Sequence, residues 1–172
     1  YVREPVPTKL TNKLKTGRLG GLLEVRDKDI VSAQDKIDKV AYLIAKEVNN
    51  IHRQGFGLDG SSGRNFFKEP SGVAGSAQTI QISQEVKNSL DAIAAAKDPN
   101  APSDNRVAIA LSGVGDLKGI ADDANSSVLD VYNSMVSELG VKTAANKKSL
   151  VFQKDVLSQL ENVRDALVGV NL

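Results

Sequence analysis

The stretch "LEVRDKDIVSAQDKIDKVAYLIAKEVNNI" (residues 23–51) decides the fold, because its large aliphatic residues recur every seven positions. These residues are Leu23, Ile30, Ile37, Ile44 and Ile51. Small or aliphatic side chains fill the intermediate positions and charged side chains occupy the other faces, as in an amphipathic helix. A helix of about 30 residues is about 45 Å long. A compact domain of this size does not need that length, so the spacing predicts an elongated bundle.

A second long helix is predicted from about Lys142 to Val168, where apolar side chains again follow a helical spacing. Shorter helices are expected between the two, one starting near Asp104 and another running from Asp122 or Asp123 to Gly140. Ser83 is expected to cap a further short helix, and residues 79–83 alternate like a short extended segment.

These patterns predict a mainly α fold. We expect an elongated antiparallel helical bundle with two long helices, shorter helices and at most a short β segment. The structural core is predicted to form where the heptad residues Leu23, Ile30, Ile37, Ile44 and Ile51 pack against Val156, Leu160, Val163 and Leu167.

Composition changes near residue 18. Residues 1–18 carry five basic side chains against one acidic side chain, Glu4. We interpret them as a lead-in or linker, or as the remnant of a neighbouring domain. Residues 19–172 are expected to form one helical bundle domain with a surface loop at 55–78.

The overall composition excludes several classes of function. The chain has 172 residues, a net charge of +1 and no cysteine. Without cysteine there can be no disulfide, no thiol catalysis and no cysteine zinc site. A charge near zero is not typical of a nucleic-acid-binding protein. No apolar run approaches the roughly 18–20 residues of a membrane span, so neither nucleic acid nor membrane is an expected partner.

Residues 55–60 spell Gly-Phe-Gly-Leu-Asp-Gly, which satisfies the G-x-G-x-x-G pattern of a dinucleotide site. In such a site the glycines follow a strand and open a helix, whose N-terminus faces the pyrophosphate. Here they follow a long helix, so the negative end of its dipole lies nearest the loop. His52, the one histidine, lacks a second metal ligand or a catalytic partner. We therefore expect a structural helix exit, with no catalytic, metal or cofactor site.

Two stretches carry a resemblance to a known family. They are "GRLGGLLEVRDKDI" (17–30) and "AYLIAKEVNNIHRQGFGLDGSSGRNFF" (41–67). Together they resemble the flagellar hook-associated protein 1 family, which has a Gly- and Leu-rich helix start and a helix-exit motif. The exit motif corresponds here to Asn49, His52, Gly55, Phe56, Asp59 and Gly60. The resemblance extends over about residues 17–172, and it implies that the family's terminal segments lie outside this fragment.

The resemblance implies a structural component of the bacterial flagellum that joins hook to filament at the hook–filament junction, without catalysis. It implies export by the flagellar secretion apparatus without a cleaved signal peptide. The implied partners are the flagellar hook protein, the second hook-associated protein and an export chaperone that binds segments absent here, with self-assembly of the full-length protein. Some relatives insert a further domain between Phe67 and Thr79.

Two alternatives from other classes stay open at this point. One is a generic coiled-coil interaction or adaptor module, which the heptad spacing alone would equally suit. The other is a nucleotide-binding enzyme that uses Gly55–Gly60.

Overall fold

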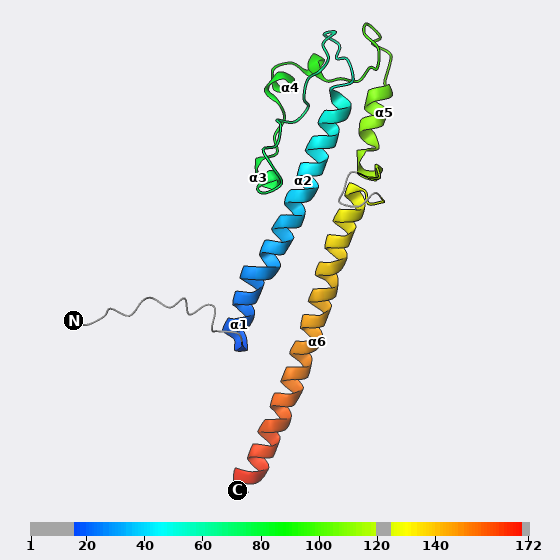
Figure 1. Cartoon of the computed structure of the whole chain (residues 1–172). Coiled ribbons are helices and arrows are strands. Elements are labelled where there is room, and N and C mark those ends of the chain that lie inside the picture. Colours follow the sequence, from blue (N-terminus) through cyan, green and yellow to red (C-terminus); the bar gives the residue numbers. More distant parts are fainter. Residues whose placement is uncertain (1–15, 120–124, 170–172) are drawn as a thin grey trace, which may run out of the picture. The chain divides into compact units, whose positions relative to one another are not determined.

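The structure is a computed structural model that describes residues 16–119 and 125–169. Helices joined by loops make up the described chain, and its β pairing consists of isolated bridges, so the predicted mainly α fold is confirmed (Figure 1). The chain divides into two compact units, residues 1–132 and 133–172. The elements are α1 (Gly17–Glu24), the π-helical turn η2 (Val25–Asp29), α2 (Ile30–His52), α3 (Ser76–Thr79), α4 (Gln84–Asn88), the 3₁₀ turns η3 (Leu90–Ala92) and η4 (Val114–Asp116), α5 (Arg106–Ser112) and α6 (Val128–Val168).

The first predicted helix is present, but a π-helical turn interrupts it. α1, η2 and α2 follow one another directly from Gly17 to His52, and the N–H of Ile30 donates to the carbonyl of Val25, five residues back. Such a turn takes up one residue more than an α turn, so the helix after it is rotated by about 100°. The spacing pattern does not reveal this turn, because Leu23 and Ile30 remain seven residues apart whether or not the turn is present.

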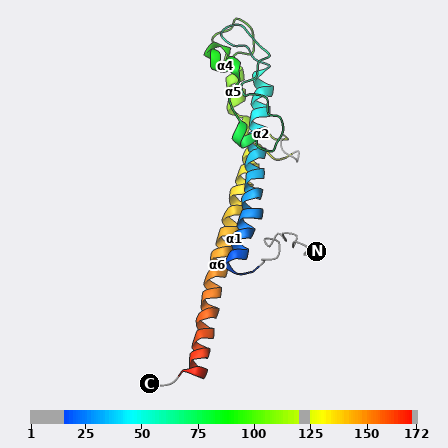
Figure 2. The same cartoon turned by 90° about the vertical axis from the view of Figure 1, so that its left-hand side faces the viewer.

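The core of the first unit lies around the C-terminal half of α2. There α2 contacts α3, α5 and η4, and Figures 1 and 2 show α5 beside it. Apart from Leu43, the buried apolar residues of this unit are alanines and valines: Ala45, Val86, Ala92, Ala94, Ala96, Val107, Val114 and Val128. Of the predicted core residues in this unit, Leu23, Ile44 and Ile51 are half-buried, whereas Ile30 and Ile37 are 48% and 46% exposed.

In the first unit the cap at Ser83 and the helix start near Asp104 are confirmed, whereas the extended segment predicted at residues 79–83 is present only in part. The hydroxyl of Ser83 accepts a hydrogen bond from the N–H of Val86 and so caps α4. The short β segment is a single bridge between Ile82 and Phe67, while Thr79 belongs to α3. Asp104 precedes α5, and its carboxylate accepts from the N–H of Arg106. The predicted helix starts at Asp122 and Asp123 lie outside the described residues.

Helix α6 corrects the predicted end at Gly140. It is one helix of 41 residues, and Gly140 lies inside it. A glycine within a helix costs about 1 kcal/mol relative to alanine, which good helix formers on both sides can offset. Val156, Leu160, Val163 and Leu167 are exposed on this helix. Their packing against the heptad residues of the first unit stays a prediction. None of the described helices is long and apolar enough to cross a membrane.

Gly140 offers a direct test of the single helix. Gly140→Ala should stabilise α6 by about 1 kcal/mol, because alanine loses less backbone entropy in a helix. Thermal melting followed by circular dichroism measures the change. Gly60→Ala is the control and should destabilise the chain, since Gly60 has φ +74. A lower melting temperature for Gly140→Ala would mean that the helix breaks at this residue.

Candidate functional site: the helix exit and its apical pocket

One face of α2 carries polar side chains that hold the loops of the first unit. Asp38, Ala45, Asn49 and His52 are spaced so that they lie within about 60° of one another around the helix. Asn49 is 0% and His52 is 1% exposed, and they are the largest fully buried side chains described. Ala45 is also buried, and its small size lets the loops lie close to the helix. We call Asp38, Asn49 and His52 the polar clamp.

His52 joins two segments that are far apart in the sequence. Its Nδ1 lies 2.8 Å from the carbonyl oxygen of Arg64, and its Nε2 lies 2.9 Å from the backbone nitrogen of Ala94. Because a carbonyl only accepts and an N–H only donates, the imidazole is neutral with its proton on Nδ1. The ring also meets the ring of Phe66 edge-on, with the centroids 5.6 Å apart. This histidine is therefore a structural connector whose two nitrogens are both in use.

Asn49 and Asp38 hold the chain that follows Phe66. The side-chain amide of Asn49 accepts from the N–H of Phe67 at 2.8 Å and donates to its carbonyl at 3.0 Å, as a neighbouring strand would. Closer to the N-terminus of α2, the carboxylate of Asp38 accepts from the N–H groups of Gly75 and Ala77. The loop between Phe67 and Ile82 is thus fixed to α2 at its start, by Asn49, and again at residues 75–77, by Asp38.

The first two glycines of the motif are required by close packing. A Cβ on Gly57 would lie 2.3 Å from the carbonyl oxygen of Asp91, and one on Gly55 would lie 3.0 Å from Ala94 Cβ. The third, Gly60, has open space but a φ of +74, a conformation that favours glycine. The spacing of the glycines therefore lets residues 91–96 lie against the exit of α2.

The backbone amides of this loop are not arranged to hold a phosphate. Five of the six N–H groups of the motif donate to carbonyl oxygens of the protein itself: Gly55 to His52, Phe56 to Ala96, Gly57 to Ser61, Asp59 to Asp91 and Gly60 to Gly57. A phosphate-binding loop instead points its free N–H groups at the ligand. Because the loop also follows the C-terminus of α2, the geometry disfavours a nucleotide site.

Asp59 organises the tip of the loop. One of its carboxylate oxygens accepts from the N–H and the hydroxyl of Ser61, and the other accepts from Arg64 at 2.6 Å. These hydrogen bonds, first of all the one from the Ser61 hydroxyl, lower the pKa of Asp59 to about 2. The motif aspartate is therefore a turn-forming carboxylate.

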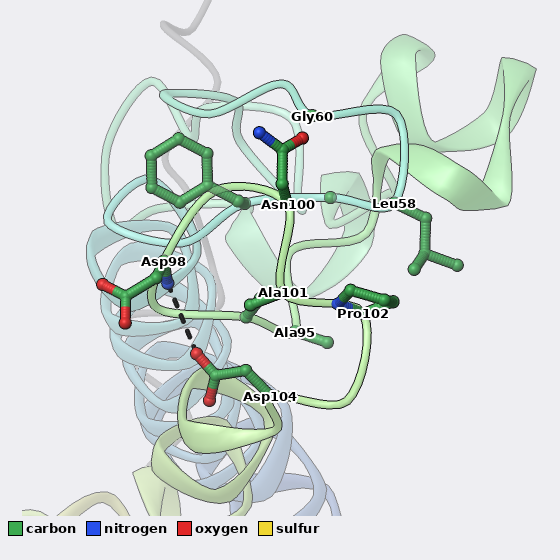
Figure 3. Close-up of a pocket in the computed structure, with 11 residues that line it drawn as sticks. Leu58, Gly60, Ala95, Asp98, Asn100, Ala101, Pro102 and Asp104 are labelled. Atoms are coloured by element: carbon green, nitrogen blue, oxygen red, sulfur yellow. Dashed lines mark hydrogen bonds between the residues drawn. The ribbon is translucent and has the colours of Figure 1, made fainter.

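The loop that follows α2 contributes Phe56, Gly57, Leu58 and Gly60 to a pocket of about 290 Å³, which we call the apical pocket (Figure 3). Its lining residues are Phe56, Gly57, Leu58, Gly60, Ala95, Ala96, Asp98, Asn100, Ala101, Pro102 and Asp104. Leu58 and Pro102 lie on one side of the pocket, and Asp98 and Asp104 lie on the other (Figure 3). Small-molecule sites usually have roughly 300–1,000 Å³, so this pocket suits a single side chain better than a dinucleotide.

The wall formed by residues 97–104 is held in place by hydrogen bonds. The carboxylate of Asp104 accepts from the N–H groups of Lys97, Asp98 and Arg106, and Arg106 donates to both Asp98 and Asp104. Hydrogen bonds from Arg106 hold the pKa of Asp104 below its usual range. Asn100 adopts a φ of 58, which asparagine tolerates better than most residues. The pocket is therefore preformed.

Sequence reasoning identified His52, Gly55, Phe56, Asp59 and Gly60 as the exit motif, and the structure brings all five to the end of α2. It missed Asp38 and the second wall of the pocket. The helical spacing of Asp38, Asn49 and His52 was available as a signal, since polar residues on one stripe of a long helix invite a partner. Nothing in the sequence showed that residues 91–104 would lie there.

Replacing His52 tests the polar clamp. His52→Ala should lower the free energy of unfolding by about 2–4 kcal/mol, because it leaves a cavity and two buried backbone groups without a partner. Urea denaturation measures the loss, and faster hydrogen exchange at the Ala94 amide locates it. Gln54→Ala, at an exposed position one turn or less away, is the matched control. Equal stability of the two variants would contradict the clamp.

The pH dependence of the loop tip tests the role of Asp59. A carboxyl whose pKa is lower in the folded state stabilises that state above its unfolded pKa, and this contribution is lost as the pH falls through the folded value. The window for Asp59 runs from about 3.8 down to about 2. NMR titration of the Ser61 amide should therefore show its change near the lower end. A midpoint close to 3.8 would contradict the network, and Asp59→Asn should abolish the change.

Comparison with known proteins agrees with this geometry. The sequence model described as "Flagellar hook-associated protein FlgK helical domain" matches residues 3–67, which include α1, α2 and the exit motif. Flagellar hook-associated protein 1 of Bacillus subtilis (strain 168) is 31% identical over 140 residues, which cover 79% of this chain and 28% of that protein. The protein of the same name from Escherichia coli (strain K12) is 24% identical over 247 residues, 97% of this chain and 44% of that protein. The protein of the same name from Salmonella typhimurium (strain LT2) is 23% identical over 252 residues, which cover 97% of this chain and 45% of that protein.

The chain thus spans from about a quarter to less than half of the length of these relatives. Two of the alignments are longer than the chain's own 172 residues, so these two relatives carry additional residues within the aligned region. The family model matches the region that holds the clamp and the exit motif, and the relatives are similar along most of the chain. Both comparisons indicate the same family. The chain belongs to the flagellar hook-associated protein 1 family.

Proposed function

We propose that the chain is the helical region of a structural subunit that joins hook to filament at the hook–filament junction of the bacterial flagellum, and that it has no catalytic role. The observation that carries this proposal is its similarity to relatives named flagellar hook-associated protein 1. The occupied loop amides support a structural reading of the glycine motif as well.

The proposal includes partners and a location. The full-length protein self-assembles and contacts the flagellar hook protein on one side and the second hook-associated protein on the other. It reaches the outside of the cell through the flagellar secretion apparatus, and an export chaperone holds segments that this chain does not contain. The polar clamp suits such a part, because a subunit of a mechanically stressed tube needs loops that stay fixed to its long helix.

Deleting the gene tests the junction role. Without the subunit, hooks should still form but should carry no attached filament, and electron microscopy of the cells measures both. The full-length protein, supplied from a plasmid, should restore filaments. Its His52→Ala variant should restore fewer than its Gln54→Ala variant, because only the former breaks the clamp. Normal filaments in the deleted strain would overturn the proposal.

The rival reading as a nucleotide-binding enzyme is tested by calorimetry with NAD and ATP. We expect no saturable heat from the chain, because carbonyl oxygens of the protein already occupy the loop amides. Micromolar binding that Gly57→Val abolishes would overturn the structural reading. Locating the labelled protein in cells distinguishes the junction role from the coiled-coil adaptor alternative. A generic adaptor would not be found between hook and filament.

A further inference from the structure

The apical pocket combines an apolar interior with an acidic side. Phe56, Ala95, Ala101 and Pro102 supply apolar walls, and the exposed Leu58 extends them outward with 69% of its surface accessible. The charged lining residues are both acidic, Asp98 and Asp104, and they share one guanidinium, that of Arg106. The side chain of Asp98 is 66% exposed, so its charge is open to a partner.

This chemistry selects a segment in which aliphatic and basic side chains alternate. An aliphatic side chain can fill the interior, while a neighbouring lysine or arginine lays its methylene stem on the apolar rim and its charge near the carboxylates. Residues 1–15 of this chain have that composition. They hold Val2, Val6, Leu10 and Leu14 together with Arg3, Lys9, Lys13 and Lys15, against one acidic residue, Glu4.

Covalent geometry decides which copy of Leu10 and Leu14 can reach the pocket. The helical run from Gly17 to His52 is about 54 Å long at 1.5 Å per residue, and the pocket lies at its far end. Leu10 and Leu14 precede Gly17 by seven and three residues. At about 3.5 Å per extended residue they reach no more than about 25 Å from the start of the helix. They cannot enter the pocket of their own chain.

We propose that the apical pocket binds the basic segment, residues 1–15, of a second copy of this chain. Leu10 or Leu14 fills the apolar interior, and Lys9 or Lys13 lies beside Asp98. Such a contact joins two different surfaces, so it repeats from copy to copy and builds a ring or a helical array. Most of the segment lies within residues 3–67, the region that matches the family's helical domain. The contact gives a surface to the self-assembly proposed above and rests on that part of the proposed function, whereas the trapping experiment below tests the contact separately from the junction role.

Disulfide trapping tests the contact, because the chain has no cysteine of its own. A full chain with Lys13→Cys is mixed with a full chain with Asn100→Cys, which lies at the pocket, and the mixture is mildly oxidised. Mass spectrometry after a non-reducing gel measures the mixed dimer. We expect severalfold more of it than with Ile109→Cys, a control that is 61% exposed and lies on α5 outside the pocket lining.

Two further experiments test whether the contact depends on the pocket's apolar rim and charge, and whether it forms between two chains or within one. Leu58→Ser, which removes the apolar rim without adding charge, or Asp98→Asn in the Asn100→Cys chain should lower the mixed dimer severalfold. High salt should do the same, because it screens exposed charges. A dilute chain that carries both cysteines should form little internal disulfide. Equal trapping at Ile109→Cys, no loss with the two pocket variants, or an efficient internal disulfide would each overturn the proposal. If no mixed dimer forms, the pocket serves a different partner and the proposal fails.

Discussion

Two buried polar side chains, Asn49 and His52, carry the organisation of the first unit. Each is bonded to the backbone of a loop, and His52 alone connects Arg64 to Ala94 across the end of α2. A buried polar group without a partner costs roughly 1–3 kcal/mol, so these loops can leave the helix only at a high cost. Since few large apolar side chains are buried among the described residues, hydrogen bonds from α2 hold the loops where other small domains use a larger apolar core.

The same constraint accounts for the glycines. Because residues 91–96 must come close enough for Ala94 to reach His52, the chain opposite them has no room for side chains at Gly55 and Gly57. That approach in turn brings residues 95–104 over the exit loop and forms the apical pocket. The glycine pattern, which in other proteins holds a phosphate, here serves the packing of one backbone against another.

Features of the fold that neighbouring residues determine could be predicted from the sequence, whereas contacts between residues far apart in the chain could not. The seven-residue spacing predicted the long helix, and the cap at Ser83 was predicted because its partner is three residues away. Gly140 suggests a helix end because an isolated glycine occurs both at helix ends and inside helices, and the neighbouring sequence does not distinguish the two. The structure shows one continuous helix on both sides of it. The polar clamp and the pocket depend on pairs such as His52 with Ala94, which no periodic pattern connects. The exit motif was found through its family resemblance, while the partners of its residues came from the structure.

The π-helical turn at Val25–Asp29 changes which residues before it lie on the same face of the helix as residues after it. One extra residue in a turn is equivalent to a one-residue insertion in an otherwise regular helix. Residues before the turn are therefore in phase with residues eight positions later, so that Leu22, and not Leu23, continues the line of Ile30 and Ile37. A relative that has one residue fewer at this point would keep an unbroken α-helix and present the same surface. Gapless alignment across Val25–Asp29 would then pair residues that face different directions.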